Sequence, residues 1–415
     1  MIRISHLIAG LATASISTAL DLNTSDTASI KDTAAEIAKV LYLYHNAEST
    51  AGDFNQPQPW FWWLSGNGWN GLLDYTVYTG DTTYQADFLV AIAENIGDNR
   101  DFVPESQYGW EANDDQAYWV YNALTALEYG FEPLPCDEKA ADGTCLNSWL
   151  ALSTNAFNLF ASRYEADSGT CNGGLKWQYR TTESGYYYKN SVTNAGFFQT
   201  AARLARYTGN QTFADWATKV WDWSSGVGFV TADFHVFDGA GDKDGANCTG
   251  INQDQWSYNI ASYLHGAAHM YAYSEDGSDA KALWESRVQG LVSAAKITFF
   301  GPTTDAPDVM YEQKCELSKG CTTDQTSFKS SLSRWLGKTA VLVPSVSDTI
   351  FELLEASAKG AAASCTGYSN STCGSQWYTG SFNSQSDFGV ELSALEIVQS
   401  LLVKSAPDFA VASKS

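Results

Sequence analysis

Twelve stretches of helical periodicity follow one another along this chain, and no run of alternating apolar and polar residues indicates a strand. A short internal echo, YTGDTTY at 78–84 and YTGNQTF at 207–213, places a glycine-containing turn between two amphipathic stretches. A recurring helix–turn–helix unit is typical of helical-hairpin arrays. The periodicity predicts helices at 32–49, 66–79, 82–96, 113–130, 147–164, 190–208, 211–224, 253–273, 279–298, 325–343, 346–358 and 386–404.

Twelve helices can pair into six hairpins, and six hairpins in one chain can close into a barrel of inner and outer helices. We therefore expect an all-α fold, an (α/α)6 barrel formed by residues 20–415 as a single domain. In such a barrel the even-numbered helices form a parallel inner set. Their N-termini then gather at one end of the barrel.

The expected starts of these inner helices are rich in Asn, Gln, Asp and Ser, with aromatic residues between them: SGNGWNG, ANDDQAYW, KNSVTNAGF, NQDQWSYN, DQTSFKS and SQSDFGVE. Helix capping explains one polar residue at each start, but not three or four. The chain also holds 15 Trp, 22 Tyr and 20 Phe, whose flat rings can stack on sugars while neighbouring amides and acids bind the hydroxyls. We expect a polar, aromatic-lined cleft at this end.

Two acids stand side by side in the stretch WEANDDQAYW at 110–119. Locally they suit a helix start, with Asn113 as N-cap, Asp114 and Asp115 at the first two helical positions, and Gln116 at the third. The helix dipole favours acids there by ~0.3–1 kcal/mol each. Their expected place in the wall of the cleft favours a second interpretation, in which the two carboxyl groups perform a reaction.

Paired carboxylates in a cleft with sugar-stacking aromatics are the equipment of glycoside hydrolysis. One carboxylate attacks or stabilises the anomeric carbon, and the other protonates the leaving oxygen. Because the two acids are neighbours in sequence, their closeness favours the retaining mechanism, and their titrations are coupled. The residues expected to bind substrate stand near the inner-helix starts: Trp63, Trp69, Asn70, Trp110, Asn113, Tyr118, Tyr187, Asn190, Asn194, Asp254, Gln255, Trp256 and Tyr258.

Other motifs are weaker. His265 and His269 lie one helical turn apart in HGAAH, but the glutamate of an HExxH zinc site is missing, so a packing role is favoured. The acidic loop DGAGDKDG at 238–245 lacks the register of a calcium-binding EF-hand and is better explained as a surface turn. We expect no metal and no cofactor. The net charge of −23 argues against a nucleic-acid or anionic-membrane partner, and we expect a monomer.

The N-terminus indicates secretion. Residues 1–19, MIRISHLIAGLATASISTA, combine one Arg, an apolar stretch and small residues, as in a cleaved signal peptide. No later run reaches the ~18 apolar residues of a membrane-spanning helix. Six of eight cysteines form close pairs (136/145, 315/321 and 365/373), which leaves 171 with 248 by elimination, although sequence alone does not prove the connectivity. Four N-x-Ser/Thr sequons begin at Asn23, Asn210, Asn247 and Asn370.

Several blocks resemble those of glycoside hydrolase family 76, in the same order from about residue 34 to 404: NDDQAYW, KNSVTNAGFF with the later ARLARYTG, QWSYN and FKSSLSRWL. This family comprises α-1,6-mannanases of bacteria and fungi, including fungal cell-wall endo-1,6-α-mannosidase-like proteins. The resemblance implies an (α/α)6 barrel and a retaining attack on α-1,6-mannan. It also implies that Asp114 is the nucleophile and Asp115 the general acid/base.

Three alternatives stay open. Some fungal relatives with a GPI signal transfer GPI-linked glycan, but this chain ends SLLVKSAPDFAVASKS, without the hydrophobic tail of such a signal. The chain is then a freely secreted member, a wall-associated member or a truncated one. A non-catalytic glycan-binding protein would keep the aromatics but needs neither acid. A magnesium-dependent cyclase would require a DDxxD cluster, of which DDQAY supplies only the first two acids.

Overall fold

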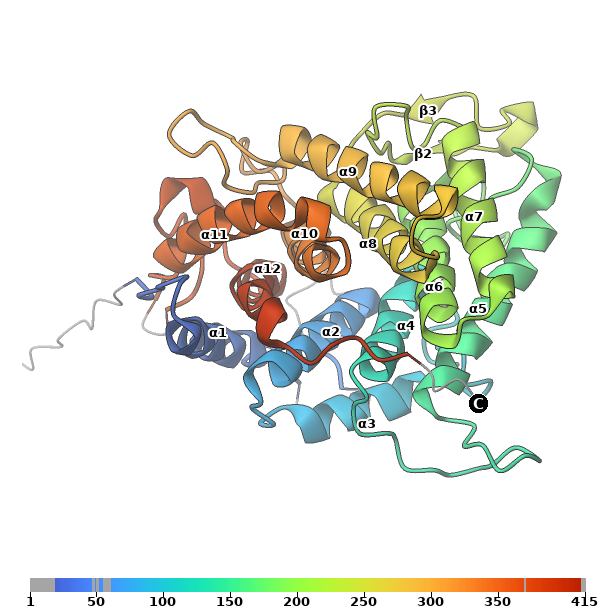
Figure 1. Ribbon diagram of the computed structural model, residues 1–415, viewed down its shortest axis with the longest axis horizontal. Coiled ribbons are helices and arrows are strands. Elements are labelled where there is room, and N and C mark those ends of the chain that lie inside the picture. The colour runs from blue at the N-terminus through green and yellow to red at the C-terminus, as the bar shows by residue number, and fades with distance from the viewer. Residues whose placement is uncertain (1–18, 47–48, 50–51, 55–60, 369–370, 412–415) are drawn as a thin grey trace, which may run out of the picture.

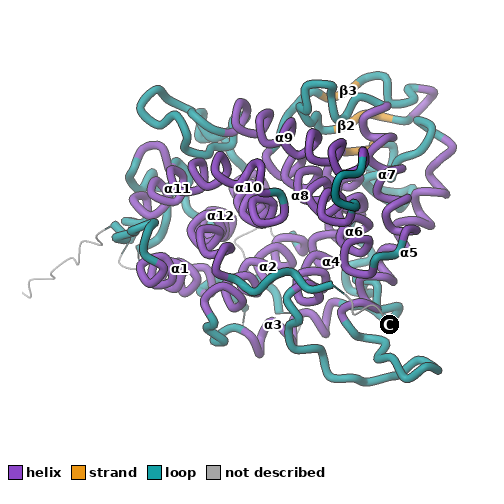
Figure 2. Tube along the Cα trace, in the orientation of Figure 1, coloured by secondary structure: helices purple, strands orange, loops and turns teal. Residues whose placement is uncertain are grey.

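The computed structural model describes residues 19–46, 49, 52–54, 61–368 and 371–411. Helices dominate these residues, as Figure 2 shows. Twelve α-helices lie within them: α1 (Thr27–Tyr42), α2 (Trp62–Thr79), α3 (Gln85–Asn95), α4 (Asn113–Glu128), α5 (Trp149–Ala166), α6 (Ser191–Thr208), α7 (Gln211–Gly226), α8 (Ser257–Tyr273), α9 (Asp279–Phe299), α10 (Thr323–Leu342), α11 (Ser347–Ser364) and α12 (Phe388–Gln399).

The even-numbered helices form a closed inner ring. Each packs against the next along the chain, from α2 through α4, α6, α8 and α10 to α12, and α12 packs against α2. The odd-numbered helices lie at the periphery of the molecule (Figure 1). Each of them packs against an inner helix that is its neighbour in the chain. This arrangement confirms the expected (α/α)6 barrel.

The inner helices are buried on almost every face. In α10, every residue from Thr326 to Ala340 is buried, including its serines and lysines. Small residues allow the inner helices to approach one another. A Cβ on Gly66 of α2 would lie 2.9 Å from the Trp119 ring of α4, so a larger residue would push these helices apart. The inner set is therefore fixed by close packing around a solid core.

Several buried charges in this core are paired. Arg203 of α6 makes a bidentate ion pair with Glu128 of α4, with donor–acceptor distances of 2.8 and 2.7 Å. Lys338 of α10 lies 2.8 Å from Asp74 of α2. Because an unpaired charge in the core is strongly unfavourable, these pairs tie neighbouring inner helices to one another.

A small antiparallel sheet, which the sequence analysis did not expect, lies beside the barrel. Its order is β1 (Tyr188–Asn190), β2 (Gly239–Gly241) and β3 (Ile251–Asn252). Strands of two or three residues are too short to show an alternating pattern in the sequence. β1 runs directly into α6, so the sheet fixes the start of that inner helix.

Four disulfides join the cysteines in the expected pairs, 136–145, 171–248, 315–321 and 365–373.

The acidic loop at 238–245 contains β2, and its Asp242 forms a buried ion pair with Lys176. His265 and His269 are buried, with their Nε2 atoms 3.1 Å apart. Within the described ranges, no helix has the length and apolar character of a membrane span. The expected signal peptide, apart from Ala19, and the sequon residue Asn370 lie outside those ranges.

Candidate active site

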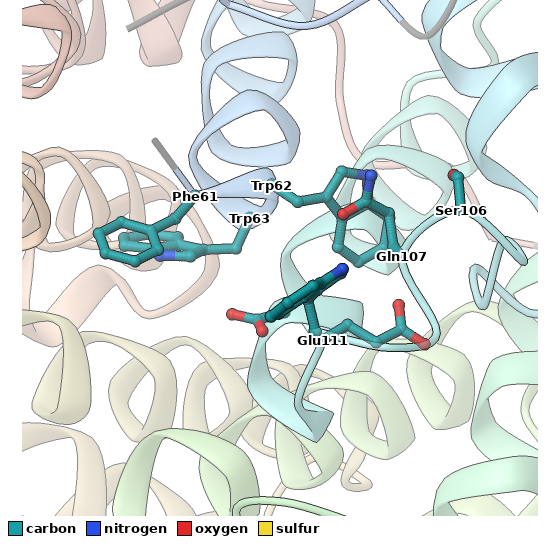
Figure 3. A pocket seen from close by; sticks show the side chains of 8 residues that line it. Phe61, Trp62, Trp63, Ser106, Gln107 and Glu111 are labelled. Atoms are coloured by element: carbon teal, nitrogen blue, oxygen red, sulfur yellow. The ribbon is translucent and has the colours of Figure 1, made fainter. Parts of the chain in front are cut away.

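Four inner helices, α2, α4, α8 and α10, contribute their N-terminal ends to a cleft made of two adjoining pockets. We call them the Asp114 pocket and the Glu111 pocket, because Asp114 lines only the first and Glu111 lines only the second. Their volumes are about 430 and about 460 Å³, respectively. The two pockets adjoin, since they share four lining residues: Phe61, Trp63, Trp110 and Asp115. Figure 3 shows the Glu111 pocket, which is also lined by Trp62, Ser106 and Gln107.

The start of α4 places both acids of the NDDQ motif at this cleft. The N-cap is Ala112, so Asp114 and Asp115 occupy the second and third helical positions. The Oδ2 of Asp115 accepts a hydrogen bond of 2.7 Å from the backbone N–H of Ala112, which satisfies one free donor of the helix start. The expected register was therefore wrong by one residue. The capping acid is Asp115, and Asn113 is not the cap.

Asp114 lies against the end of β1. The Nδ2 of Asn190 is 3.5 Å from its Oδ2, and the backbone N–H of Asp115 donates to its Oδ1 at 3.2 Å. Burial raises the pKa of Asp114 to about 7, although hydrogen bonds from Asn190 and Trp177 lower it. A carboxyl with such a pKa can exchange its proton near neutral pH.

The pKa of Asp115 is raised as well. Burial raises the pKa of Asp115 well above its usual range, and the charges of Asp114, Glu111 and Asp324 raise it further. The charge of Asp114 favours the protonated form of Asp115, so the two carboxyl groups titrate as a coupled pair. A nucleophile beside a general acid requires that one carboxyl group of such a pair be ionised while the other is protonated.

Two further acids at the cleft were missed by the sequence analysis. Asp324 lines the Asp114 pocket, where Trp63 Nε1 donates to its Oδ1 at 3.1 Å, and burial raises its pKa to about 6. Glu111 lines the Glu111 pocket and accepts a hydrogen bond of 2.7 Å from the hydroxyl of Tyr179. Burial raises the pKa of Glu111 to about 8. Glu111 lies in WEANDDQAYW and Asp324 in DQTSFKS, both at expected starts of inner helices. An acid at such a start was therefore a signal in the sequence for a cleft residue.

Six of the residues expected to bind substrate lie at the cleft or next to its lining. Trp63, Trp110, Tyr118 and Tyr258 line the Asp114 pocket. The Tyr258 ring stacks on Phe328, another lining residue, at a centroid distance of 3.9 Å. The other two are Asn190, which contacts Asp114, and Trp256, which packs edge-on against Phe328.

The expectation that Trp69 and Asn70 bind substrate is wrong. α2 begins at Trp62 rather than at residue 66, so these two residues lie about two turns inside the barrel. Both are fully buried. The Trp69 Nε1 donates to the carbonyl of Gly52 at 2.7 Å, and Asn70 Nδ2 lies 3.5 Å from the carbonyl of Tyr121. They have no surface to offer to a ligand.

Asn113 and Asn194 are also fully buried, and the expectation that they touch substrate is wrong for them too. Asn113 Nδ2 donates to the carbonyl of Lys176 at 2.9 Å, and its backbone N–H donates to the carbonyl of Trp177. Asn194 pairs with the backbone of Leu175 through both its Oδ1 and its Nδ2. These asparagines hold the loop that presents Trp177 to the cleft.

The last three expected residues lie outside the lining of both pockets. The ammonium groups of Lys176 and Lys243 lie over the ring of Tyr187. Asp254 pairs with Lys314 at 2.5 Å. Gln255 Oε1 is 3.0 Å from Nδ1 of His235.

An (α/α)6 barrel with adjacent carboxyl groups in an aromatic-lined cleft has the groups that glycoside hydrolysis requires, and the comparisons with known proteins show that the chain is a glycoside hydrolase. The family model of glycosyl hydrolase family 76 matches residues 29–413. The chain is 38% identical over 386 residues to the mannan endo-1,6-alpha-mannosidase DCW1 of Saccharomyces cerevisiae, a match that covers 92% of this chain and 80% of that protein.

Solved structures agree with this match. The crystal structure of Dfg5 from Chaetomium thermophilum in complex with glucosamine superposes with a TM-score of 0.85 at 33% identity, covering 94% of each chain. The GH76A alpha-1,6-mannanase of Salegentibacter shares the fold, with a TM-score of 0.68 at 17% identity, over 89% of this chain and 98% of that one. The chain belongs to glycosyl hydrolase family 76.

Proposed function

We propose that this chain is a secreted, retaining endo-glycosidase that cleaves α-1,6-mannosidic linkages in cell-wall mannan or a related glycan. One observation carries the proposal: Asp114 and Asp115 lie side by side in the aromatic-lined cleft, where burial raises the pKa of both and the charge of Asp114 raises that of Asp115 further. Neighbouring carboxyl groups suit the ~5–5.5 Å separation of retaining enzymes better than the ~6.5–9.5 Å of inverting ones.

The two acids have different roles in this mechanism. The ionised Asp114 attacks the anomeric carbon and forms a glycosyl-enzyme, while Asp115 donates its proton to the departing oxygen. Ala112 N–H occupies Oδ2 of Asp115, which leaves Oδ1 to hold the proton. In the second step Asp115 accepts a proton from the incoming water or sugar hydroxyl, and the bond to Asp114 breaks.

The substrate class rests on the relatives and on the lining of the cleft. The Saccharomyces relative is named a mannan endo-1,6-alpha-mannosidase. Trp63, Tyr118 and Tyr258 supply faces for sugar rings, and Gln178 and Asp324 supply groups that bind hydroxyls. Asp115 lines both pockets, and cleavage within a chain requires room for sugars on both sides of the acid. Four disulfides and the expected signal peptide support an extracellular location.

The test is product analysis. The protein is incubated with linear α-1,6-manno-oligosaccharides, the products are separated, and the anomer formed first is identified by proton NMR. We expect shorter oligosaccharides that are released initially as the α anomer, and products longer than the substrate if transfer competes with hydrolysis. Absence of any product, or initial release of the β anomer, would refute the proposal.

A further inference from the structure

A second, small hydrophobic cluster lies apart from the barrel core, around the disulfide between Cys171 and Cys248. Its buried members are Cys171, Trp223, Phe229, Ala240 and Cys248, and Val227 and Ile251 pack against it while staying partly exposed. Cys248 is also the middle residue of the sequon Asn247-Cys248-Thr249. An acceptor motif for N-glycosylation and a disulfide therefore share one residue.

The Asn247 side chain is held through only one of its two polar atoms. Its Oδ1 accepts a hydrogen bond of 2.6 Å from the backbone N–H of Cys171, whereas its Nδ2 has no hydrogen-bond partner among the described residues. Asn247 and Thr249 are both exposed. N-glycosylation uses the free atom: Nδ2 loses a proton and bonds to the anomeric carbon of a lipid-diphosphate-linked oligosaccharide, and the bond from that carbon to the diphosphate breaks. The folded loop can hold this glycan without losing the hydrogen bond to Cys171.

A hollow of about 320 Å³ lies directly beside Asn247, in the region of α7 and β3 (Figure 1). Both cysteines of the disulfide line it, together with Asn172, Gly226, Val227, Thr249 and Ile251. Its volume is at the lower end of those that hold a small ligand. The aliphatic side chains can cover the apolar face of one sugar, and the amide and hydroxyl groups can bind its polar substituents.

We propose that Asn247 carries an N-linked glycan and that the first N-acetylglucosamine of this glycan lies in the hollow, over the disulfide. Cys171 and Cys248 are only 1% and 3% exposed, so a sugar in the hollow closes the route by which a thiol attacks their sulfur atoms. The proposal does not depend on the roles of Asp114 and Asp115. It requires only the secretory route that the expected signal peptide and the disulfides support.

Glycopeptide mapping by mass spectrometry tests the modification itself, on protein secreted from a yeast host. We expect the peptide that contains Asn247 to carry a glycan in most molecules. Thr249→Ala should abolish this glycan and Thr249→Ser should keep it, because either hydroxyl residue completes the motif. Secreted wild-type protein that is unmodified at Asn247 would overturn the proposal.

The position of the first sugar is tested by the rate at which dithiothreitol reduces each disulfide of the folded protein, measured by alkylation and mass spectrometry. The rate at Cys171–Cys248 is divided by the rate at Cys136–Cys145, because Cys136 is exposed and neither Cys136 nor Cys145 lines the hollow. We expect this ratio to be roughly fivefold lower in the glycosylated protein than in the same chain made without glycans, since thiol–disulfide exchange depends on access. Trimming the glycan to its first N-acetylglucosamine with an endoglycosidase should leave the ratio low.

Two variants separate the glycan at Asn247 from other glycans. Thr249→Ala keeps Asn247 and its hydrogen bond to Cys171, so its ratio should equal that of the wild-type chain made without glycans. The matched control is Thr212→Ala, which removes the sequon of Asn210, an exposed residue outside the lining of the hollow, and it should keep the low ratio. Equal ratios with and without the Asn247 glycan, or loss of protection after trimming, would overturn the placement of the sugar over the disulfide.

Discussion

Replacing Arg203 by methionine should destabilise the barrel strongly. Arg203 and Glu128 are both fully buried, and two hydrogen bonds of 2.8 and 2.7 Å join them. Burial alone would raise the pKa of Glu128, but the charges of Arg203 and His269 lower it to about 2. Relative to the ordinary value of 4.5, this lowered pKa corresponds to roughly 3 kcal/mol of stability.

Arg203→Met leaves Glu128 as a buried carboxylate without its main partner. We expect the free energy of unfolding at pH 7 to fall by about 3–5 kcal/mol. A carboxyl with a lowered pKa stabilises the fold above its unfolded pKa, and this contribution is lost as the pH falls from about 4.5 towards 2. The difference between wild type and variant should therefore shrink in acid.

The assay is denaturant unfolding monitored by fluorescence at pH 7 and at pH 4. The control is Lys219→Met, because Lys219 makes an exposed ion pair with Glu165 and should contribute less than ~1 kcal/mol. The double variant Glu128→Gln/Arg203→Met should regain part of the loss, since no charge is then left unpaired. A loss below about 1 kcal/mol for Arg203→Met at pH 7 would refute this account of the core.

Trp110 is 81% exposed and lines the cleft, so Trp110→Ala should weaken oligosaccharide binding roughly tenfold, about 1.4 kcal/mol, at nearly unchanged stability. Calorimetry measures the affinity, with Tyr368→Ala as the control, because Tyr368 is 70% exposed and lies outside the cleft lining. Equal affinity of both variants for the oligosaccharide would contradict the prediction. Asp324→Asn removes a negative charge that raises the pKa of Asp115. The alkaline limb of the profile of kcat/KM against pH should therefore move to lower pH, and an unmoved limb would exclude this coupling. Replacing Cys171 and Cys248 by alanine opens a loop with a sequence separation of 77 and should cost up to about 4.5 kcal/mol in denaturant unfolding, whereas an unchanged midpoint would show that the bridge does not stabilise the fold.

The hairpin pattern was enough to predict the barrel, but not the depth of each residue in it. The serine, glycine and asparagine residues of SGNGWNG resemble a helix start, and α2 was predicted to begin at residue 66. α2 begins earlier because Trp62 stacks on Trp119 of α4, at a centroid distance of 5.1 Å. Such packing between helices overrides local capping preferences. Trp69 was therefore wrongly expected to line the cleft.

The positions of Asp324 and Glu111 at the cleft could not be predicted from the residues next to them in the sequence. Asp324 resembles an ordinary acid in a first helical turn, but Thr322 and Gln325 make the capping box of α10 and leave Asp324 to face the cleft. The environment of Glu111 depends on Tyr179, which is 68 positions away in the sequence. Neither relation can be found from a pattern within one helix.

The assignment of Asp114 and Asp115 depends on one kinetic comparison of Asp114→Asn with Asp115→Asn. The substrate is an activated α-mannoside whose leaving group needs no proton, and azide is added as a small nucleophile. We expect Asp115→Asn to form the glycosyl-enzyme and to regain turnover with azide, because only its proton transfer is lost, a step worth typically ~10²–10⁴-fold. Asp114→Asn should form no glycosyl-enzyme and should not respond to azide. Near-normal cleavage of α-1,6-mannan by either folded variant would contradict the assignment, and the acids would then serve only to start α4.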